Sequence, residues 1–455
     1  MLKRSLPLFL VLLLTVALSA PVMAQDDLVF PIGEGPFHWE NLDQFRDIDL
    51  SGETISIFGP WLGPDQELWE SVLAYFVDAT GVTINNAGSD SFEQQIIIDI
   101  EAGSPPNIAI FPQPGLAADA ASRGGLVPLS DELRDVVLND YAAGQSWVDL
   151  GTYADENGED QYFGFFYKVD LKSLVWYSPE NFEDNGYEVP TTMEELITLS
   201  EQMVADGNTP WCIGIGSGDA TGWPATDWVE DLMLRTQPPE VYDQWVANEI
   251  PFNDPAVVNA IEIFGQFAKN DAWVNGGAVA VASTDFRDSP QGLFTVPPQC
   301  FMHRQASFIS TFFPEDVELG VDADFFYFPA YESEDLGSPV LGAGTVFTIT
   351  QDSEATRVLM DYLATPLANE IWMAQAGMLS PHSGVNLDAY ANDVLRGQGE
   401  ILLNATTFRF DASDLMPGAI GAGAFWTGMV DFVSGASAQE AADAIQASWD
   451  AIKED

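Results

Sequence analysis

The stretch Thr54-Ile55-Ser56-Ile57-Phe58-Gly59-Pro60-Trp61 opens the part of the chain that decides the fold. Its first five residues alternate as a β-strand does, and Gly59-Pro60-Trp61 ends that strand. Helical and strand patterns then alternate: a helix from Asp65 to Gly81, a strand at Val82-Thr83-Ile84, a helix from Phe92 to Ala102 and a strand at Asn107-Ile108-Ala109-Ile110-Phe111. Strands that alternate with helices are typical of a parallel sheet with crossover helices, so the sequence predicts an α/β fold.

A second α/β unit follows in the chain. Asn157-Gly158 predicts a hairpin, and Thr192-Met193-Glu194-Glu195 is a capping box that opens a helix. Asp254-Pro255 begins another helix, and further helical patterns occupy about 353–376 and 437–452. Because no low-complexity linker separates the two units, we expect the chain to cross between two lobes more than once.

Residues 1–24 have the features of a signal peptide. Met1-Leu2-Lys3-Arg4 is basic, residues 6–20 are apolar, and Val22-Met23-Ala24 forms a small-residue cleavage site. The apolar run is shorter than the roughly 20 residues that span a bilayer, and no Cys follows the cleavage point to carry a lipid anchor. These features predict export to the periplasm. Residues 25–50, which show no clear periodicity, predict an extended N-terminal arm.

The chain is strongly acidic, with 15 Lys and Arg residues against 70 Asp and Glu residues and a formal net charge of −55. Such a charge repels nucleic acid and anionic membrane surfaces, so neither is expected as a partner. The composition is nonetheless that of a globular protein, because 47% of the residues are hydrophobic and 12% are aromatic.

The two cysteines of the chain are Cys212 and Cys300. In an oxidising compartment, two Cys far apart in the sequence favour a disulfide, with two free thiols as the alternative. The sequence therefore predicts a bond that closes a long loop and stabilises the fold.

The sequence contains no complete motif of an enzyme or a cofactor site. The three histidines lack the spacing of zinc ligands, and Gly214-Ile215-Gly216-Ser217-Gly218 lacks the third glycine and the acidic partner of a dinucleotide loop. The acidic run 155–160 is either a calcium loop or a solvated hairpin, and the hairpin is favoured because the spacing of a calcium motif is missing. The sequence thus predicts no metal, no cofactor and no catalytic residue, although a glycosidase pair among 70 carboxylates stays open.

Aromatic residues recur beside polar residues where strands end or helices begin. The segments are Gly59-Pro60-Trp61, Phe111-Pro112-Gln113-Pro114-Gly115, Gly222-Trp223-Pro224-Ala225-Thr226-Asp227-Trp228, Met302-His303-Arg304-Gln305 and Phe425-Trp426-Thr427-Gly428. Ligands of open α/β sheets bind outside the carboxyl ends of strands. A sugar needs this mixture, because its C–H faces pack on aromatic rings and its hydroxyls need hydrogen-bond partners.

Each of these candidates has a structural alternative. A lone Trp packs a core, an Asp such as Asp90 or Asp227 caps a helix or turn, and His303 and Arg304 satisfy one another. Lys168, Lys172 and Arg304 are rare cations within these segments, and ion pairs explain them as well as ligand contacts do. Trp426 follows the small residues Gly421-Ala422-Gly423-Ala424, which predict a loop that projects the Trp ring into a cleft.

In these segments the chain resembles the family 1 extracellular solute-binding proteins of ABC importers, especially the alpha-glucoside-binding members. The resemblance runs from about Thr54 to Trp449. The segments that carry it are Phe58-Gly59-Pro60-Trp61, Phe111-Pro112-Gln113-Pro114-Gly115 and Lys172-Ser173-Leu174-Val175-Trp176-Tyr177. The most distinctive ones are Trp211-Cys212-Ile213-Gly214, the stretch from Gly222 to Trp228, and the stretch from Cys300 to Phe308.

The resemblance implies a type II, maltose-binding-protein-like fold in which two α/β lobes enclose a cleft. Lobe 1 would comprise residues 51–166 and 327–377, and lobe 2 residues 167–326 and 378–455. Three crossings would join the lobes near 166–168, 327–329 and 379–381. The positions carried over as ligand contacts are Trp61, Gln113, Trp223, Asp227 and Trp426, and the further candidates are Ser89, Asp90, His303, Arg304 and Gln305.

The function implied is reversible capture of a sugar by lobe closure and its delivery to the permease of an ABC transporter. Two alternatives remain open, a secreted carbohydrate-active enzyme and a sugar receptor for a membrane sensor. The chain departs from members in single-membrane bacteria, which usually carry a lipidated Cys, and this departure favours a periplasm. A monomer is expected.

Overall fold

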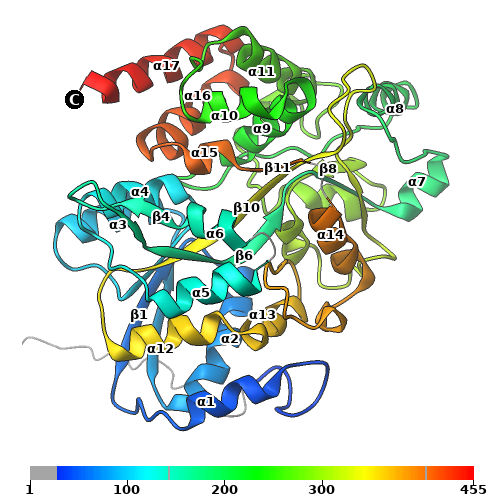
Figure 1. Cartoon of the computed structure of the whole chain (residues 1–455). Helices are drawn as coiled ribbons and strands as arrows, with labels where there is room; N and C mark the ends of the chain where they lie inside the picture. Colours follow the sequence, from blue (N-terminus) through cyan, green and yellow to red (C-terminus); the bar gives the residue numbers. More distant parts are fainter. Residues whose placement is uncertain (1–27, 142–143, 405–406, 455) are drawn as a thin grey trace, which may run out of the picture.

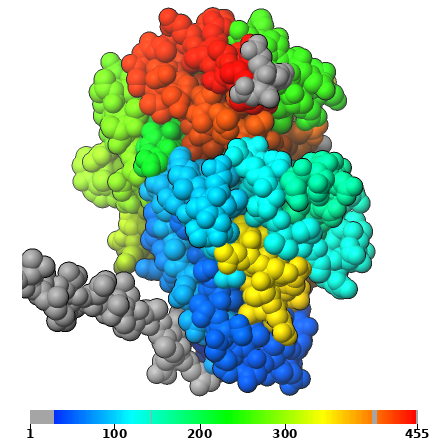
Figure 2. Space-filling view, turned by 90° about the vertical axis from the view of Figure 1, so that its left-hand side faces the viewer, coloured from blue at the N-terminus to red at the C-terminus, as the bar shows by residue number. Residues whose placement is uncertain are grey.

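The computed structural model describes residues 28–141, 144–404 and 407–454, so the predicted signal peptide lies outside the described residues. The chain forms two lobes (Figure 1). One contains a six-stranded sheet and the other a three-stranded sheet, and we call them the large-sheet lobe and the small-sheet lobe. Figure 2 shows blue, cyan and yellow segments of the large-sheet lobe at the bottom, below green and red segments of the small-sheet lobe.

The six-stranded sheet is mixed, and its first three strands confirm the predicted parallel arrangement. Its strands are β1 (Thr54–Gly59), β2 (Thr83–Gly88), β3 (Ile108–Phe111), β6 (Gly164–Leu171), β10 (Pro339–Ile349) and β11 (Thr407–Phe410). They lie in the order β11-β10-β3-β1-β2, and β6 pairs with β10. β1 pairs in parallel with both β2 and β3, whereas β10 runs antiparallel to β3. The carboxyl ends of β1, β2 and β3 therefore lie at one edge of the sheet.

Helices cover this sheet. They are η2 (Trp39–Leu42), α1 (Asp43–Arg46), α2 (Pro64–Thr80), α3 (Phe92–Glu101), α4 (Pro114–Ser122), α5 (Asp131–Asp140), α6 (Gly144–Leu150), α12 (Glu354–Leu363) and α13 (Pro366–Met373). α2 begins with Pro64 in its first turn and ends at Gly81, whose φ of 74° is left-handed. The helical pattern predicted over 353–376 is two helices, because the side chain of Thr365 accepts a hydrogen bond from the Ala368 amide and starts α13 anew.

The predicted N-terminal arm is not extended throughout. It contains η2 and α1, and it buries Leu42 and Phe45 against the large-sheet lobe. The ring of Phe45 meets the ring of Tyr362 edge-on at 5.5 Å, which fastens this arm to α12.

The small-sheet lobe is built on β7 (Leu174–Tyr177), with β8 (Met302–Arg304) and β9 (Asp324–Tyr327) paired to it on either side. Its helices are α7 (Pro179–Asn185), α8 (Met193–Ala205), α9 (Trp223–Thr236), α10 (Pro239–Val246), α11 (Pro255–Ala268), α15 (Ala412–Leu415), α16 (Trp426–Val433) and α17 (Ala438–Glu454), and the π-helix Ala419–Phe425 precedes α16. Both predicted helix starts are confirmed, since Thr192 and Glu195 form a capping box and Asp254 caps α11.

The remaining described elements belong to neither of the two main sheets. They are the hairpin strands β4 (Thr152–Ala154) and β5 (Asp160–Tyr162), the 3-10 turns Ala278–Ala280, Ser289–Phe294, Ser307–Phe312 and Leu387–Ala389, and α14 (Asp393–Asn404). β4 and β5 pair antiparallel around Asn157-Gly158, which confirms the predicted hairpin.

Two long strands carry the chain past the junction of the lobes. All eight residues of β6 and all eleven of β10 are buried. Their antiparallel register shifts between Thr345 and Val346, opposite Lys168 and Phe166. Such a shift re-aims side chains locally.

The predicted disulfide is present. Cys212 and Cys300 are bonded, with their Cα atoms 5.4 Å apart and 88 residues between them in sequence. The bond ties the segment before α9 to the segment before β8, close to Gly292.

Candidate functional site

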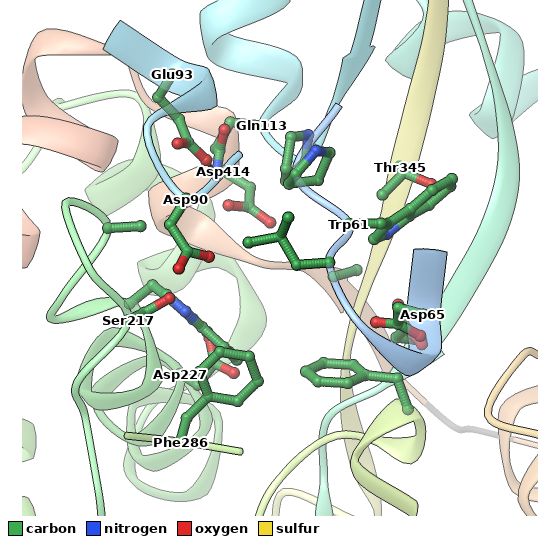
Figure 3. Close-up of a pocket in the computed structure, with 18 of the residues that line it drawn as sticks. Trp61, Asp65, Asp90, Glu93, Gln113, Ser217, Asp227, Phe286, Thr345 and Asp414 are labelled. Carbon is green, nitrogen blue, oxygen red and sulfur yellow. Dashed lines mark hydrogen bonds between the residues drawn. The ribbon is translucent and has the colours of Figure 1, made fainter. Parts of the chain in front are cut away.

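A cavity of about 920 Å³, counting the part open to solvent, lies between the two lobes (Figure 3). The segments that follow β1, β2 and β3 form one wall, through Trp61, Asp90 and Gln113. The first residues of α9 and α16 contribute Trp223 and Trp426 from the small-sheet lobe. The ligand position expected for an open α/β sheet, outside the carboxyl ends of its strands, is thus the position of this cavity.

The structure brings together seven of the ten residues proposed as ligand contacts. The seven that line the cavity are Trp61, Ser89, Asp90, Gln113, Trp223, Asp227 and Trp426. They come from segments separated by hundreds of residues in sequence, and the fold gathers them because three strand ends and two helix starts meet there.

The other three proposed residues lie outside this lining. His303 is buried, its Nδ1 lies 2.8 Å from the carbonyl oxygen of Cys212, and burial lowers its pKa to about 4. Arg304 donates from Nη2 to Asp231 Oδ2 at 2.7 Å, and the carbonyl of Gln305 accepts from Trp176 Nε1 at 3.1 Å. These three residues support the interior of the small-sheet lobe.

The three Trp residues of the cavity differ in their surroundings. Trp61 is packed edge-on against the ring of Trp372 at 4.9 Å, and Trp223 against Phe286 at the same distance. Trp426 is 3% exposed, and its Nε1 has no hydrogen-bond partner among the described residues. Each ring therefore combines core packing with a place in the cavity wall.

The loop predicted before Trp426 is wrong. Residues 419–425 form a π-helix that continues into α16, and Trp426 is the first residue of α16. The close backbone approach expected of the small residues is present, because a Cβ on Gly421 would lie 1.8 Å from the carbonyl oxygen of Ser413. Because Gly421 has no side chain beyond a hydrogen, α15 can pack directly against the π-helix.

A buried charge cluster holds Asp227 in place. Lys172 Nζ donates to Asp227 Oδ1 at 2.7 Å and also to Asp411. Burial lowers the pKa of Lys172, but the two carboxylates outweigh burial and raise that pKa well above its usual value. Burial raises the pKa of Asp227 to about 7, although the positive charge of Lys172 by itself would lower that pKa. The second carboxylate oxygen, Asp227 Oδ2, accepts no hydrogen bond from the described residues, and Arg304 Nη1 lies 3.9 Å from it.

The same cluster has the composition of a metal site but is organised around Lys172. Oxygens of Asp227, Glu230 and Asp411 lie within 4.8 Å of one another. The Lys172 ammonium already bonds two of these carboxylates, so a side-chain cation occupies the position that a metal ion would need. The residues of this cluster therefore fit a metal ion poorly.

Five buried polar atoms in the cavity wall have no hydrogen-bond partner among the described residues. They are Asp65 Oδ1, Gln113 Oε1, Asp227 Oδ2, Thr345 Oγ1 and Trp426 Nε1. Buried polar atoms are rarely left without partners, because each costs roughly 1–3 kcal/mol of desolvation. Four of these atoms are acceptors or hydroxyls and one is a donor, and because their residues line one cavity, the set suits a ligand rich in hydroxyl groups.

Sequence reasoning missed several residues of the cavity. Asp65 was assigned only to the start of a helix, and Thr345 belongs to a strand that carries no signal of its own. Glu93 lines the cavity as well, accepts from Gln113 Nε2 at 3.3 Å, and has its pKa raised to about 7 by burial. The rarity of cations was a usable signal, since both Lys168 and Lys172 line the cavity.

A model of the family described as "Bacterial extracellular solute-binding protein" matches residues 63–294. The sequence is also 62% identical over 430 residues to the alpha-glucosides-binding periplasmic protein AglE of Rhizobium meliloti (strain 1021), which covers 94% of each chain. The chain belongs to the bacterial extracellular solute-binding protein family. A second relative of this solute-binding protein is the osmoprotective compounds-binding protein GgtB of Synechocystis sp., 45% identical across 88% of this chain and 93% of that one.

Solved structures agree on the fold of this solute-binding protein. The bacterial solute receptor AcbH superposes with a TM-score of 0.74 at 18% identity and covers 88% of this chain and 100% of its own. A maltose-bound MalE3 of T. maritima gives a TM-score of 0.68 at 14% identity, with the same coverage. The predicted two-lobed, type II architecture is thereby confirmed. Within the described residues, no helix is long and apolar enough to cross a membrane.

Proposed function

We propose that this solute-binding protein is the substrate-binding component of an ABC transporter and captures an alpha-glucoside by closing its lobes. The observation that carries the proposal is the set of five unpartnered polar atoms in a cavity walled by three Trp rings. Ring faces pack on C–H groups, and the polar atoms take up hydroxyls. The 62% identity to a protein named for binding alpha-glucosides directs the choice of sugar.

Capture and release, without bond breaking, is the proposed mechanism. A glycosidase needs a proton donor and a second carboxylate on opposite sides of the bond to be broken. Asp227 is committed to Lys172 through one oxygen, and Glu93 is bonded to Gln113. We therefore propose that these carboxylates act as hydrogen-bonding groups and that the protein is not an enzyme. A receptor that signals through a membrane sensor would bind sugar in the same way and differ only in its partner.

We further propose lobe boundaries at 51–166 with 327–377 and at 167–326 with 378–455, so that the end of β6 and all of β11 belong to the second lobe although both strands pair with β10 of the six-stranded sheet. The proposed crossings, near 166–168, 327–329 and 379–381, are supported by contacts that β6 and the residues just after it make. Val169 forms a bridge with Leu379, and the Phe328 amide donates to the carbonyl of Ser173 at 2.9 Å. Three adjacent segments give a hinge about which two rigid lobes can swing.

Export through residues 1–24 to the periplasm, delivery of sugar to permease subunits, and a monomeric state complete the proposal. Members of this family are extracellular by description. The acidic surface, with its net charge of −55, opposes association between copies of the chain at low salt.

The test is a thermal-shift screen with maltose, sucrose and trehalose beside the β-linked disaccharide cellobiose. A ligand that binds only the folded protein raises the melting temperature by mass action. At a concentration one hundred times its Kd, it adds about 2.7 kcal/mol to the free energy of unfolding. We expect a rise with at least one α-linked sugar, no rise with cellobiose, and unchanged sugar after incubation. Absence of any rise with the α-linked sugars, or the appearance of monosaccharides, contradicts the proposal.

A further inference from the structure

We propose that one end of the cavity, formed by Asp65, Lys168 and Thr345, is a separate subsite that binds neighbouring hydroxyl groups of a second sugar ring. We call it the Asp65 subsite. It rests on the proposed function and makes it more specific, because it requires a neutral ligand of at least two rings. None of its three residues was among the ligand contacts expected from the sequence.

The charges of the Asp65 subsite are close but not bonded. Lys168 Nζ lies 3.9 Å from Asp65 Oδ1 and 3.6 Å from Asp170 Oδ2, with all three side chains less than a tenth exposed. A hydrogen bond between an ammonium and a carboxylate is about 2.7–2.9 Å long. Asp65 Oδ1 has no other hydrogen-bond partner among the described residues. A buried donor and a buried acceptor thus face each other with unused capacity.

Aromatic rings hold Lys168 in this position. Its Nζ lies 5.0 Å from the ring centre of Phe308, 5.4 Å from that of Trp372 and 5.9 Å from that of Trp61. Cation–π attraction of this kind is favourable and independent of Asp65. The ammonium is therefore kept from forming a hydrogen bond with the carboxylate, and both groups keep hydrogen-bonding capacity for a hydroxyl that bridges them.

Thr345 adds a hydroxyl to the same end. It pairs with Lys168 in the β6–β10 ladder, next to the shift in register, and its Oγ1 has no partner among the described residues. Figure 3 shows Thr345, Asp65 and Trp61 together on one side of the cavity, with Glu93, Gln113 and Asp414 on the other. The unpartnered Gln113 Oε1 belongs to that other side, so a ligand that satisfies both Gln113 Oε1 and Asp65 Oδ1 must reach across the cavity.

The chemistry of the Asp65 subsite selects neutral hydroxyl groups. A sugar hydroxyl donates to Asp65 Oδ1 while it accepts from Lys168 Nζ, and a neighbouring hydroxyl exchanges a hydrogen bond with Thr345 Oγ1. A carboxylate or phosphate on the ligand would face Asp65 and Asp170, and an ammonium group would face Lys168, in a buried site where like charges repel strongly. Uronic acids, sugar phosphates and amino sugars are therefore excluded from this end.

The decisive variant is Thr345→Val, which keeps the shape of the side chain and removes a hydroxyl with no hydrogen-bond partner in the described part of the chain. We expect an unchanged or higher melting temperature without ligand, and a Kd for maltose three- to tenfold weaker than that of the wild type. Thr348→Val is the matched control on the same strand, because its hydroxyl donates to the Ala109 carbonyl at 3.1 Å and lies outside the cavity. It should show the reverse, a lower melting temperature with an unchanged Kd.

Asp65→Asn provides a second measurement, because it keeps an acceptor but removes the charge that repels anionic rings. We expect weaker binding of maltose and a relative gain for a disaccharide that carries a uronic acid. If the wild type binds no α-linked sugar, the proposed function and the subsite both fail. If it binds maltose and both variants keep the wild-type Kd, the Asp65 subsite alone is refuted.

Discussion

Arg287 Nη2 donates to Asp90 Oδ1 at 2.7 Å across the cleft. Asp90 follows β2 of the large-sheet lobe, whereas Arg287 belongs to the segment that pairs with Gly216 ahead of α9. The hydroxyl of Ser91 donates to Asp219 Oδ2 at 2.5 Å beside this pair. Asp90 was expected to touch sugar, and the structure gives its side chain a second role, a contact between the lobes.

The first prediction concerns this ion pair. Asp90→Asn or Arg287→Gln should release bound sugar about two- to fivefold faster, because a partly exposed pair contributes roughly 0.2–1 kcal/mol to the closed form. Stopped-flow dissociation measures the rate. Asp285→Asn is the control, since it removes the partner of Arg287 on the same side of the cleft, 3.3 Å away, and should leave the rate nearly unchanged. An equal effect of all three variants would mean that the pair does not bridge the lobes in solution.

The second prediction concerns Trp426. Trp426→Phe keeps a ring but removes Nε1, which has no hydrogen-bond partner within residues 28–141, 144–404 and 407–454, so affinity should fall three- to tenfold with little loss of stability. Trp426→Ala should also lower stability, by about 3–5 kcal/mol, because the ring is 3% exposed. Urea unfolding and sugar titration of both variants separate the two effects. Unchanged affinity per folded molecule in both would leave Trp426 with a packing role alone.

The third prediction concerns pH. Burial raises the pKa of Glu93 from 4.5 to about 7, so the folded protein binds this proton more tightly than the unfolded chain does. The resulting stability is complete below about pH 4.5 and is lost as pH rises through about 7, with a slope of at most about 1.4 kcal/mol per pH unit. Glu93→Gln should remove this part of the pH dependence in urea unfolding between pH 5 and 8. A slope identical to that of the wild type would show that Glu93 does not titrate in this range.

The fourth prediction concerns the disulfide. Intact protein should show no alkylation of Cys212 or Cys300 without reductant, by mass spectrometry. Replacing both by Ala should lower stability by about 2–5 kcal/mol, because the bond closes a loop of 88 residues that is free in the unfolded chain. Two thiols that alkylate without reductant would contradict the bond.

The fifth prediction concerns metal. Sugar affinity should be the same with and without a chelator, because Lys172 occupies the cation position among Asp227, Glu230 and Asp411. Calorimetric titration in the two buffers measures it. A large loss of affinity on chelation would mean that an ion, there or at the acidic hairpin, holds the site together.

Sequence patterns predicted the parts of the site that depend on local order. Trp61, Asp90 and Gln113 come directly after strands, and parallel strands bring their carboxyl ends to one edge. Thr345 could not be found in this way, because its place in the cavity depends on how β10 pairs with β6, a strand far away in sequence.

Charged residues were harder to assign than aromatic ones. His303 and Arg304 had the chemistry of ligand contacts, but Asp231 and the carbonyl of Cys212 engage them inside the small-sheet lobe. Nothing near them in the sequence reveals those partners. Asp65 was not predicted as a ligand contact for a different reason. An acidic residue in the first turn of a helix is already explained by its favourable interaction with the helix dipole.

Calorimetric titration of the mature protein with maltose, sucrose and trehalose at one temperature tests the central claim most directly. We predict saturable heat with one molecule of at least one of these sugars per chain, and complete recovery of that sugar afterwards. Heat from none of the three, or recovery of cleaved sugar, would contradict a protein that captures and releases an alpha-glucoside in this cavity.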